Sequence, residues 1–178
     1  VSTRTFMVTI LPAVAVESDE VFELDLVNPT GGVGLGVPGV GVPVTIQNDD
    51  AAPTLTVSNV SHAEGNVGPT AFTFTVTKSN TGNPSTVDFE TANGTATEPD
   101  DYAAANGTLS FAVGEGTKTI TVLVNGDTTF ESSETFFVEL SDPGGATIAD
   151  GEGQGTIQTD DAPPDFTLSA TARKSRGD

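Results

Sequence analysis

Ala71-Phe72-Thr73-Phe74-Thr75-Val76-Thr77-Lys78 places an apolar side chain at every second position, with threonines between them. In an extended strand successive side chains point to opposite faces, so this spacing gives one apolar face and one polar face. A helix would require apolar residues three or four positions apart. The segment therefore predicts a β-strand with one buried face and one face in water.

The same alternation recurs through the middle of the chain. It predicts six more strands, at Leu55–Ser58, Thr86–Thr91, Thr108–Val113, Lys118–Asn125, Thr135–Ser141 and Gly155–Thr159. Turn-forming residues such as Asn93-Gly94 and Asp142-Pro143-Gly144-Gly145 separate them. Seven short strands at this spacing are typical of an all-β protein, here an immunoglobulin-like antiparallel β-sandwich.

The chain also repeats itself. Glu17–Leu24 matches Glu131–Val138 at a shift of 114 residues, and Thr45–Asp50 matches Thr156–Asp161 at a shift of 111. Residues 1–50 are therefore expected to be the C-terminal half, the last three strands, of a preceding repeat. Residues 51–53 are expected to form a linker, 54–161 one complete seven-stranded domain, and 162–178 a linker with the first strand of a following repeat.

Composition restricts the partners. The chain has 25 acidic and 6 basic residues, a formal net charge of −19, and no cysteine. Such a charge repels nucleic acid and anionic membrane surfaces. No apolar run approaches the roughly 18 residues of a membrane-spanning helix. We expect no nucleic acid partner and no membrane insertion, and cations are the natural partners.

Strand direction predicts where the acidic residues meet. If each strand reverses the direction of the one before, the first, third and fifth connections lie at the same pole as the end of the last strand. The acidic residues in these places are Glu64, Glu98, Asp100, Asp101, Asp127, Glu131, Glu134, Asp160 and Asp161. Any one of them could equally be an ordinary solubilising loop residue. Their joint convergence favours a shared role.

A bound cation would relieve the repulsion among these carboxylates, which reaches about 4 kcal/mol for a pair 4 Å apart at an effective dielectric constant near 20. Carboxylate oxygens suit calcium, which takes six to eight oxygen ligands, better than the smaller magnesium. Zinc is disfavoured because the chain has no cysteine and one histidine. The sequence therefore predicts calcium as the cofactor.

Several short motifs together resemble the Calx-beta domain, found in the regulatory loops of sodium/calcium exchangers and in bacterial surface proteins. They are Glu64-Gly65, Gly94-Thr95-Ala96 with Asp101-Tyr102, Gly107–Phe111, Asp127–Phe136 and Thr156–Asp161. The resemblance implies that calcium is held by Glu64, Asp101, Asp127, Glu131, Glu134, Asp160 and Asp161.

Two departures from the exchanger pattern lower the number of ions expected. Gly126 and Thr128 flank Asp127 where the exchanger domains have a run of aspartates, and Thr159 replaces another aspartate. We expect one or two calcium ions in the complete domain. In the earlier copy Ala13 replaces the equivalent of Asp127 and the first four strands with their ligands are absent, so we expect that copy alone to bind calcium poorly or not at all.

Catalysis is not expected. Glu131 and Glu134 could be compared with the acid pair of a glycosidase, but both fall within the ligand set. The one histidine, His62, has no serine or cysteine partner motif. No catalytic residue and no cofactor-binding residue other than the metal ligands is predicted.

The favoured function is a calcium-binding structural module of a secreted or cell-surface repeat protein, in which calcium rigidifies the junction between domains. Its partners would be calcium ions and neighbouring repeats or copies of the same chain. One alternative is a subunit of an extracellular filament, in which a tail strand at Phe166–Ala170 complements the half-domain of another copy. A second alternative is a calcium-dependent adhesin.

Overall fold

The computed structural model describes residues 5–25, 27, 31 and 41–169, and within them every regular element is a strand. The strands are β1 (Glu20–Leu24), β2 (Val42–Ile46), β3 (Thr54–Val57), β4 (Val60–Ala63), β5 (Gly68–Lys78), β6 (Ser85–Asn93), β7 (Asn106–Phe111), β8 (Thr117–Gly126), β9 (Glu134–Gly144), β10 (Thr147–Asp150) and β11 (Glu152–Gln158). Among the residues described, no helix is long and apolar enough to cross a membrane.

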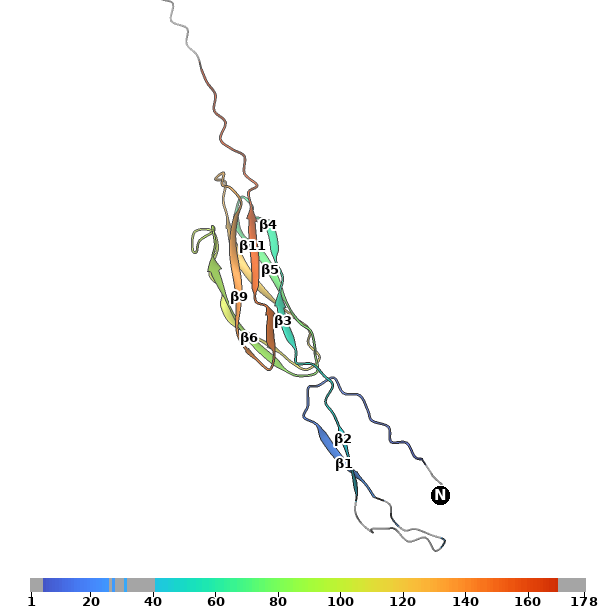
Figure 1. Ribbon diagram of the computed structural model, residues 1–178. Coiled ribbons are helices and arrows are strands. Elements are labelled where there is room, and N and C mark those ends of the chain that lie inside the picture. Colours follow the sequence, from blue (N-terminus) through green and yellow to red (C-terminus); the bar gives the residue numbers. More distant parts are fainter. Residues whose placement is uncertain (1–4, 26, 28–30, 32–40, 170–178) are drawn as a thin grey trace, which may run out of the picture.

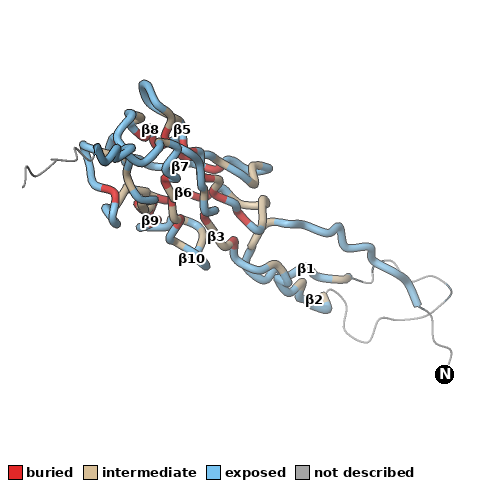
Figure 2. The backbone as a smooth tube through the Cα atoms, turned by 90° about the horizontal axis from the view of Figure 1, so that it is seen from above, coloured by how far each residue is buried: buried red, intermediate tan, exposed pale blue. Residues whose placement is uncertain are grey.

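Strands β3 to β11 form a sandwich of two sheets (Figure 1). One sheet has the order β10-β3-β5-β8 and the other β4-β11-β9-β6-β7. The alternation in β5 is visible in its burial, because Phe72, Phe74 and Val76 are fully buried while their neighbours Ala71, Thr73 and Thr77 are exposed. The red buried positions in Figure 2 lie along the sandwich, and none lies on β1 or β2. The predicted all-β immunoglobulin-like sandwich is confirmed.

The domain has nine strands where the sequence predicts seven, and two pairs are parallel. The expected strand at Leu55–Ser58 ends at Val57 and continues in the other sheet as β4. Ser58 still pairs with Thr75, through its backbone N–H and its hydroxyl, whereas Asn59 already accepts a hydrogen bond from the backbone of Gln154 in the other sheet. The chain therefore changes sheets between Ser58 and Asn59.

The predicted last strand, Gly155–Thr159, corresponds to β11, and β10 is an additional strand in the connection before it. β10 pairs with β3, and β11 pairs with both β9 and β4. Because β3 and β4 run in the same direction as β10 and β11, the pairs β10–β3 and β11–β4 are parallel. The purely antiparallel arrangement predicted from the sequence is wrong at these edges, since alternation reveals which residues are buried but not which strands are neighbours.

Phe136 of β9 occupies the centre of the core. Its ring stacks on Tyr102 with a centroid separation of 4.6 Å and contacts Phe72 and Phe74 at 5.8 Å each. All four side chains are fully buried. Tyr102 comes from the connection between β6 and β7, so the same packing fixes a loop that carries predicted site residues.

The N-terminal ribbon of β1 and β2 lies beyond the end of the sandwich opposite the C-terminal tail (Figure 1). Its pairs include Glu20 with Ile46 and Phe22 with Val44. With the shifts found in the sequence, these become Glu134 with Ile157 and Phe136 with Gly155, which are paired in the β9–β11 ladder. The ribbon therefore repeats the register of β9 and β11.

The third strand expected in the first 50 residues is not formed among residues 5–19. Its counterpart in the complete domain, β8, is paired along its whole length with β5, and the described residues before β3 include no counterpart of β5. Residues 159–169 also form no strand, and Phe166 and Leu168 are 93% and 97% exposed. The remainder of the predicted Phe166–Ala170 strand, Ala170, lies outside the described residues.

Candidate metal centre

The acidic pole is the end of the sandwich where the β4–β5 turn, the β6–β7 and β8–β9 connections and the end of β11 meet. Six of the seven predicted ligands gather here in two groups. The first contains Glu64, Asp160 and Asp161, and the second contains Asp101, Glu131 and Glu134; in each group the carboxylate oxygens lie within 4.8 Å of one another.

Glu64 is held at the pole by the turn that follows β4. Gly65 adopts a φ of 84°, which glycine alone adopts without strain, and the hydroxyl of Thr70 donates to the carbonyl oxygen of Glu64. Gly126 closes the turn from the β8 side, since a Cβ there would overlap the Gly65 carbonyl oxygen. This close packing leaves Glu64 only 6% exposed.

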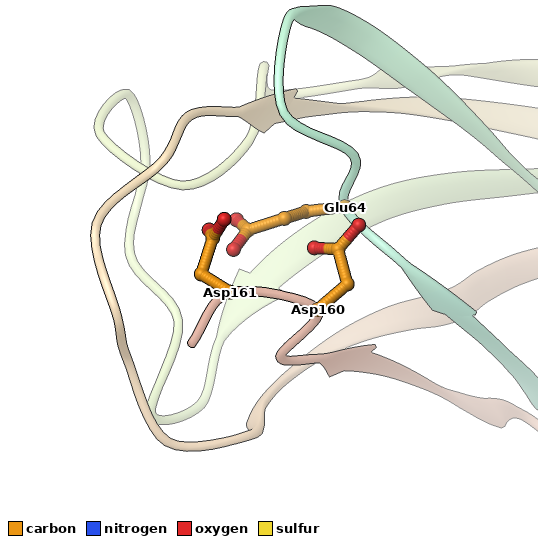
Figure 3. Close-up of side chains that lie close together, drawn as sticks. All are labelled: Glu64, Asp160 and Asp161. Atoms are coloured by element: carbon orange, nitrogen blue, oxygen red, sulfur yellow. The ribbon is translucent and has the colours of Figure 1, made fainter. Parts of the chain in front are cut away.

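Asp160 and Asp161 reach the same point from the end of β11. Figure 3 shows the carboxylates of Glu64 and Asp161 close together, with Asp160 beside them. Asn66 donates from Nδ2 to Oδ1 of Asp161 at 2.7 Å. The other oxygen, Oδ2, is buried and has no hydrogen-bond partner. An unpaired buried carboxylate oxygen is costly, and a cation would satisfy it.

The second group depends on the β6–β7 connection. The backbone N–H of Thr97 donates to Oδ2 of Asp101 at 2.7 Å, and the N–H of Asn125 in β8 donates to the carbonyl oxygen of Asp101 at 2.8 Å. Asn125 also donates from Nδ2 to the carbonyl oxygens of Pro99 and Asp100, at 2.9 Å each. Asp101 is thereby anchored to the sandwich before any ligand binds.

Asp127, the seventh predicted ligand, belongs to neither group. Its Oδ1 accepts a hydrogen bond from the backbone N–H of Thr129. Its charge nevertheless acts on both groups, because it contributes to raising the pKa of Glu64 in one and of Glu131 in the other. The negative charge of Asp127 therefore influences a carboxylate in each group.

The pKa values record the crowding of negative charge. Burial, and then the charges of Glu131, Asp127, Asp160 and Asp161, raise the pKa of Glu64 from 4.5 to about 7. Burial is likewise the largest cause of the raised pKa of Glu131, followed by the charges of Asp127, Asp101 and Asp161.

The pKa of Glu134 is also raised, first by burial and then by the charges of Asp101 and Glu131. A positive ion at the pole would act against every one of these shifts. The electrostatics therefore favour cation binding over the bare carboxylate cluster.

Sequence reasoning did not single out Asn66. The residue stands two positions after Glu64, in a turn where asparagine is common, and its contact with Asp161 spans 95 positions. It also missed Asn93, whose Oδ1 accepts hydrogen bonds from the Tyr102 hydroxyl and from the Glu98 backbone. Both asparagines orient ligands or loops, and no local pattern distinguishes them from other turn residues.

The donor set fits a hard cation. Every candidate atom is an oxygen, the two groups together offer carboxylates from four separate segments, and one buried oxygen lacks a partner. Calcium accepts six to eight such ligands in flexible geometry, with glutamates binding through one or both oxygens. The residues at the pole therefore match the group that the sequence predicts.

Comparison with known families agrees with this geometry. The profile of the Calx-beta domain matches residues 48–162. The chain belongs to the Calx-beta domain family. The matched part includes both sheets of the sandwich and all seven predicted ligands of this Calx-beta chain.

A curated relative is the sodium/calcium exchanger Calx of Drosophila melanogaster, which is 29% identical over 144 residues. The matched part is 80% of this Calx-beta chain and 15% of the exchanger. The chain therefore spans a small fraction of the length of the curated relative it matches.

Two solved structures support the same assignment. The apo form of the Calx CBD1 domain has a TM-score of 0.57 and 25% identity, covering 62% of this chain and 100% of that domain. The calcium binding domain CBD12 of CALX1.1 has a TM-score of 0.56 and 25% identity, covering 65% of this chain and 50% of that protein.

Proposed function

We propose that this chain is a non-catalytic calcium-binding module, with the ions held at the acidic pole by Glu64, Asp101, Asp127, Glu131, Glu134, Asp160 and Asp161. The observation that carries the proposal is the buried, unpaired Oδ2 of Asp161 beside the almost fully buried Glu64. Membership of the Calx-beta family and the likeness to a structure described as a calcium binding domain support it.

Calorimetric titration with calcium tests this proposal. The intact chain is expected to bind one or two ions, and Asp127→Asn and Glu131→Gln are expected to weaken binding. Glu139→Gln is the matched control, because Glu139 is an exposed carboxylate in the middle of β9. An intact chain that releases or absorbs no binding heat, and whose melting temperature calcium leaves unchanged, would refute the proposal.

We assign the bound calcium a mechanical role at the junction that follows the domain. Asp160 and Asp161 stand directly before residues 162–169, which form no strand and are exposed. A bound ion would tie the start of this segment to Glu64 and so restrict its direction. Amide hydrogen exchange of residues 160–166 should slow in calcium relative to EDTA. Equal exchange in both conditions would remove the mechanical role and leave binding itself intact.

A filament subunit is the second candidate, and the open face of the β1–β2 ribbon favours it. Phe22 and Leu24 are only half-buried, whereas their equivalents Phe136 and Val138 are fully buried by the second sheet. Among the described residues no second sheet covers that face. Phe166 and Leu168 are exposed and stand two positions apart, as in a strand with one apolar face. The segment that contains them could therefore add a strand to the β1–β2 ribbon of another copy.

Deletion of residues 165–178 tests the filament. Polymers of the intact chain should be visible by electron microscopy and should disappear on deletion, and also in the double variant Phe166→Ser, Leu168→Ser. Polymers that survive both changes, or an intact chain that stays monomeric, would reject this route.

Localisation and adhesion remain predictions from the sequence. The curated relative named above is a sodium/calcium exchanger, and it gives no support to an extracellular location. No observation on the described residues favours an adhesin, and we do not propose one.

A further inference from the structure

The loop between β5 and β6, residues 79–84, lies at the end of the sandwich opposite the acidic pole. There it meets the segment Val14–Val16, which precedes the β1–β2 ribbon. In the N-terminal segment Ala15 and Val16 are half-buried, while residues 5–14 and 17–20 are exposed. Burial in this part of the chain is therefore concentrated where it touches the loop.

Asn83 recognises the backbone of Val16 at both of its polar atoms. The N–H of Val16 donates to Oδ1 of Asn83 at 2.6 Å, and Nδ2 of Asn83 donates to the carbonyl oxygen of Val16 at 3.3 Å. A side-chain amide offers one acceptor and two donors, so Asn83 pairs with this residue as a neighbouring strand would. Replacing it by alanine would remove both bonds.

Gly82 permits the close approach. A Cβ at this position would overlap the carbonyl oxygen of Val14, and that carbonyl belongs to the backbone, which cannot turn aside as a side chain can. Asn80 adds a third contact, from its Nδ2 to the carbonyl oxygen of Ala51 in the linker, at 3.0 Å. The loop therefore touches both the preceding unit and the linker.

The loop is held in shape by its own domain. Lys78, 3% exposed, donates from Nζ to the carbonyl oxygen of Asn83 at 2.7 Å and lies 5.4 Å from the centre of the Phe111 ring. The N–H of Gly82 donates to Oδ1 of Asn80 at 2.8 Å. Because its contacts are formed within the sandwich, the loop loses little freedom when a neighbour docks.

We propose that residues Ser79–Asn83 of this loop form a docking clamp, which fixes the direction of the preceding unit relative to the complete domain. Asn83 supplies the polar contact, Gly82 the space and Asn80 the attachment to the linker. The partner recognised is the exposed backbone of the segment that precedes the last two strands of a neighbouring repeat.

Because the sequence repeats, the segment that the clamp contacts has an equivalent at the acidic pole of the complete domain. At the shift of 114 residues, Val14–Val16 corresponds to Thr128–Phe130, which lies between Asp127 and Glu131. A following repeat with the same loop would dock between these two candidate ligands. This step, unlike the clamp itself, rests on the proposed calcium binding.

Two spin labels on the full chain test the clamp. The chain has no cysteine, so Thr45→Cys in β2 and Thr119→Cys in β8, both exposed positions, create unique labelling sites. Pulsed electron–electron double resonance then measures the distance distribution between the ribbon and the sandwich. The labelled parent is expected to give one narrow distribution.

Asn83→Ala and Gly82→Val are each expected to broaden the distribution about twofold or more, since relative motion is the default for units with a small interface. The control Asn106→Ala, an exposed asparagine at the start of β7, should leave it unchanged. A broad distribution in the parent, or an unchanged width in Asn83→Ala, overturns the clamp.

The measurement is made in EDTA and in calcium, because the clamp contains no carboxylate and should be narrow in both. Calorimetry on the same proteins reports calcium binding separately. The two proposals are therefore tested independently: the clamp can be refuted while calcium binding is confirmed, and the reverse is equally possible. A circular dichroism melt of each variant checks that the sandwich remains folded, and a Gly82→Val protein that unfolds leaves Asn83→Ala as the deciding variant.

Discussion

Asn66 and Asp161 are joined by a 2.7 Å hydrogen bond between turns that are 95 residues apart in sequence. The bond occupies one oxygen of the carboxylate, and the other is buried without a partner. The acidic pole is therefore organised in advance of any ion, with one oxygen oriented by an amide and one left for a ligand. The proposed function predicts how this pole responds to mutation, calcium and pH.

The change Asn66→Ala should reduce calcium affinity by about 10- to 100-fold, the usual effect of removing a group that orients a metal ligand. Asp161 would lose the bond that fixes its carboxylate. Calorimetric titration measures the change. Asn106→Ala is the control, and an Asn66→Ala protein with the affinity of the parent would show that Asp161 needs no orientation.

Calcium should stabilise the folded domain. A ligand that binds only the folded state adds RT ln(1 + [L]/Kd) to the free energy of unfolding, about 2.7 kcal/mol at a calcium concentration of 100 Kd. For a domain of this size that corresponds to an increase in Tm of about 10 °C or more. Differential scanning calorimetry in calcium and in EDTA measures it.

Magnesium at the same concentration is the control, and it should give a smaller shift because it loses its water ligands reluctantly. Equal melting temperatures in calcium and EDTA would contradict the prediction.

Without calcium, stability should fall as the pH rises from about 4.5 to about 7. Burial and neighbouring acids raise the pKa of Glu64 from 4.5 to about 7, so in this window the folded state binds more protons than the unfolded state. Stability then decreases with pH. The raised pKa values of Glu131 and Glu134 act in the same direction.

Urea denaturation in EDTA at pH 5 and pH 8 measures this effect. The midpoint should be lower at pH 8, and Glu64→Gln should reduce the difference. Because calcium competes with the proton for these carboxylates, calcium affinity should rise over the same pH range. A midpoint that increases towards pH 8 would show that the pole is not electrostatically strained.

Phe136→Ala should destabilise the domain by about 3–5 kcal/mol, since it removes a fully buried aromatic side chain from the centre of the core. Phe166→Ala, at a position that is 93% exposed, is the matched control and should change stability by less than about 0.5 kcal/mol. Urea denaturation of both in EDTA measures the difference. Similar values for the two variants would mean that Phe136 is not central to the core.

Much of the fold was predictable because its information is local. The alternation at Phe72, Phe74 and Val76 follows from the period of two in a strand, and these three side chains are fully buried. The repeat of Glu17–Leu24 with Glu131–Val138 identified two segments, β1 and β9, that pair with their partners in the same register. Neither inference required knowledge of distant contacts.

The division of β3 from β4 was not predictable in this way. It depends on Ser58 bonding Thr75 in one sheet and on Asn59 bonding Gln154 in the other. These contacts join residues far apart in the chain, and the local alternation is the same whichever sheet a strand enters. The absence of the expected strand in residues 5–19 has the same origin, because a strand needs a neighbour to complete its hydrogen bonds.

Residue types and strand direction were sufficient to place acidic side chains at one pole, since the number of chain reversals fixes which connections share an end. They could not specify that Glu64 would be almost fully buried, that the acids would form two groups with Asp127 outside both, or that Asn66 would orient Asp161. The burial of Glu64 depends on how tightly the turns pack at Gly65 and Gly126. Packing at that scale is decided by contacts between distant segments, and these exist only once the two sheets have closed on each other.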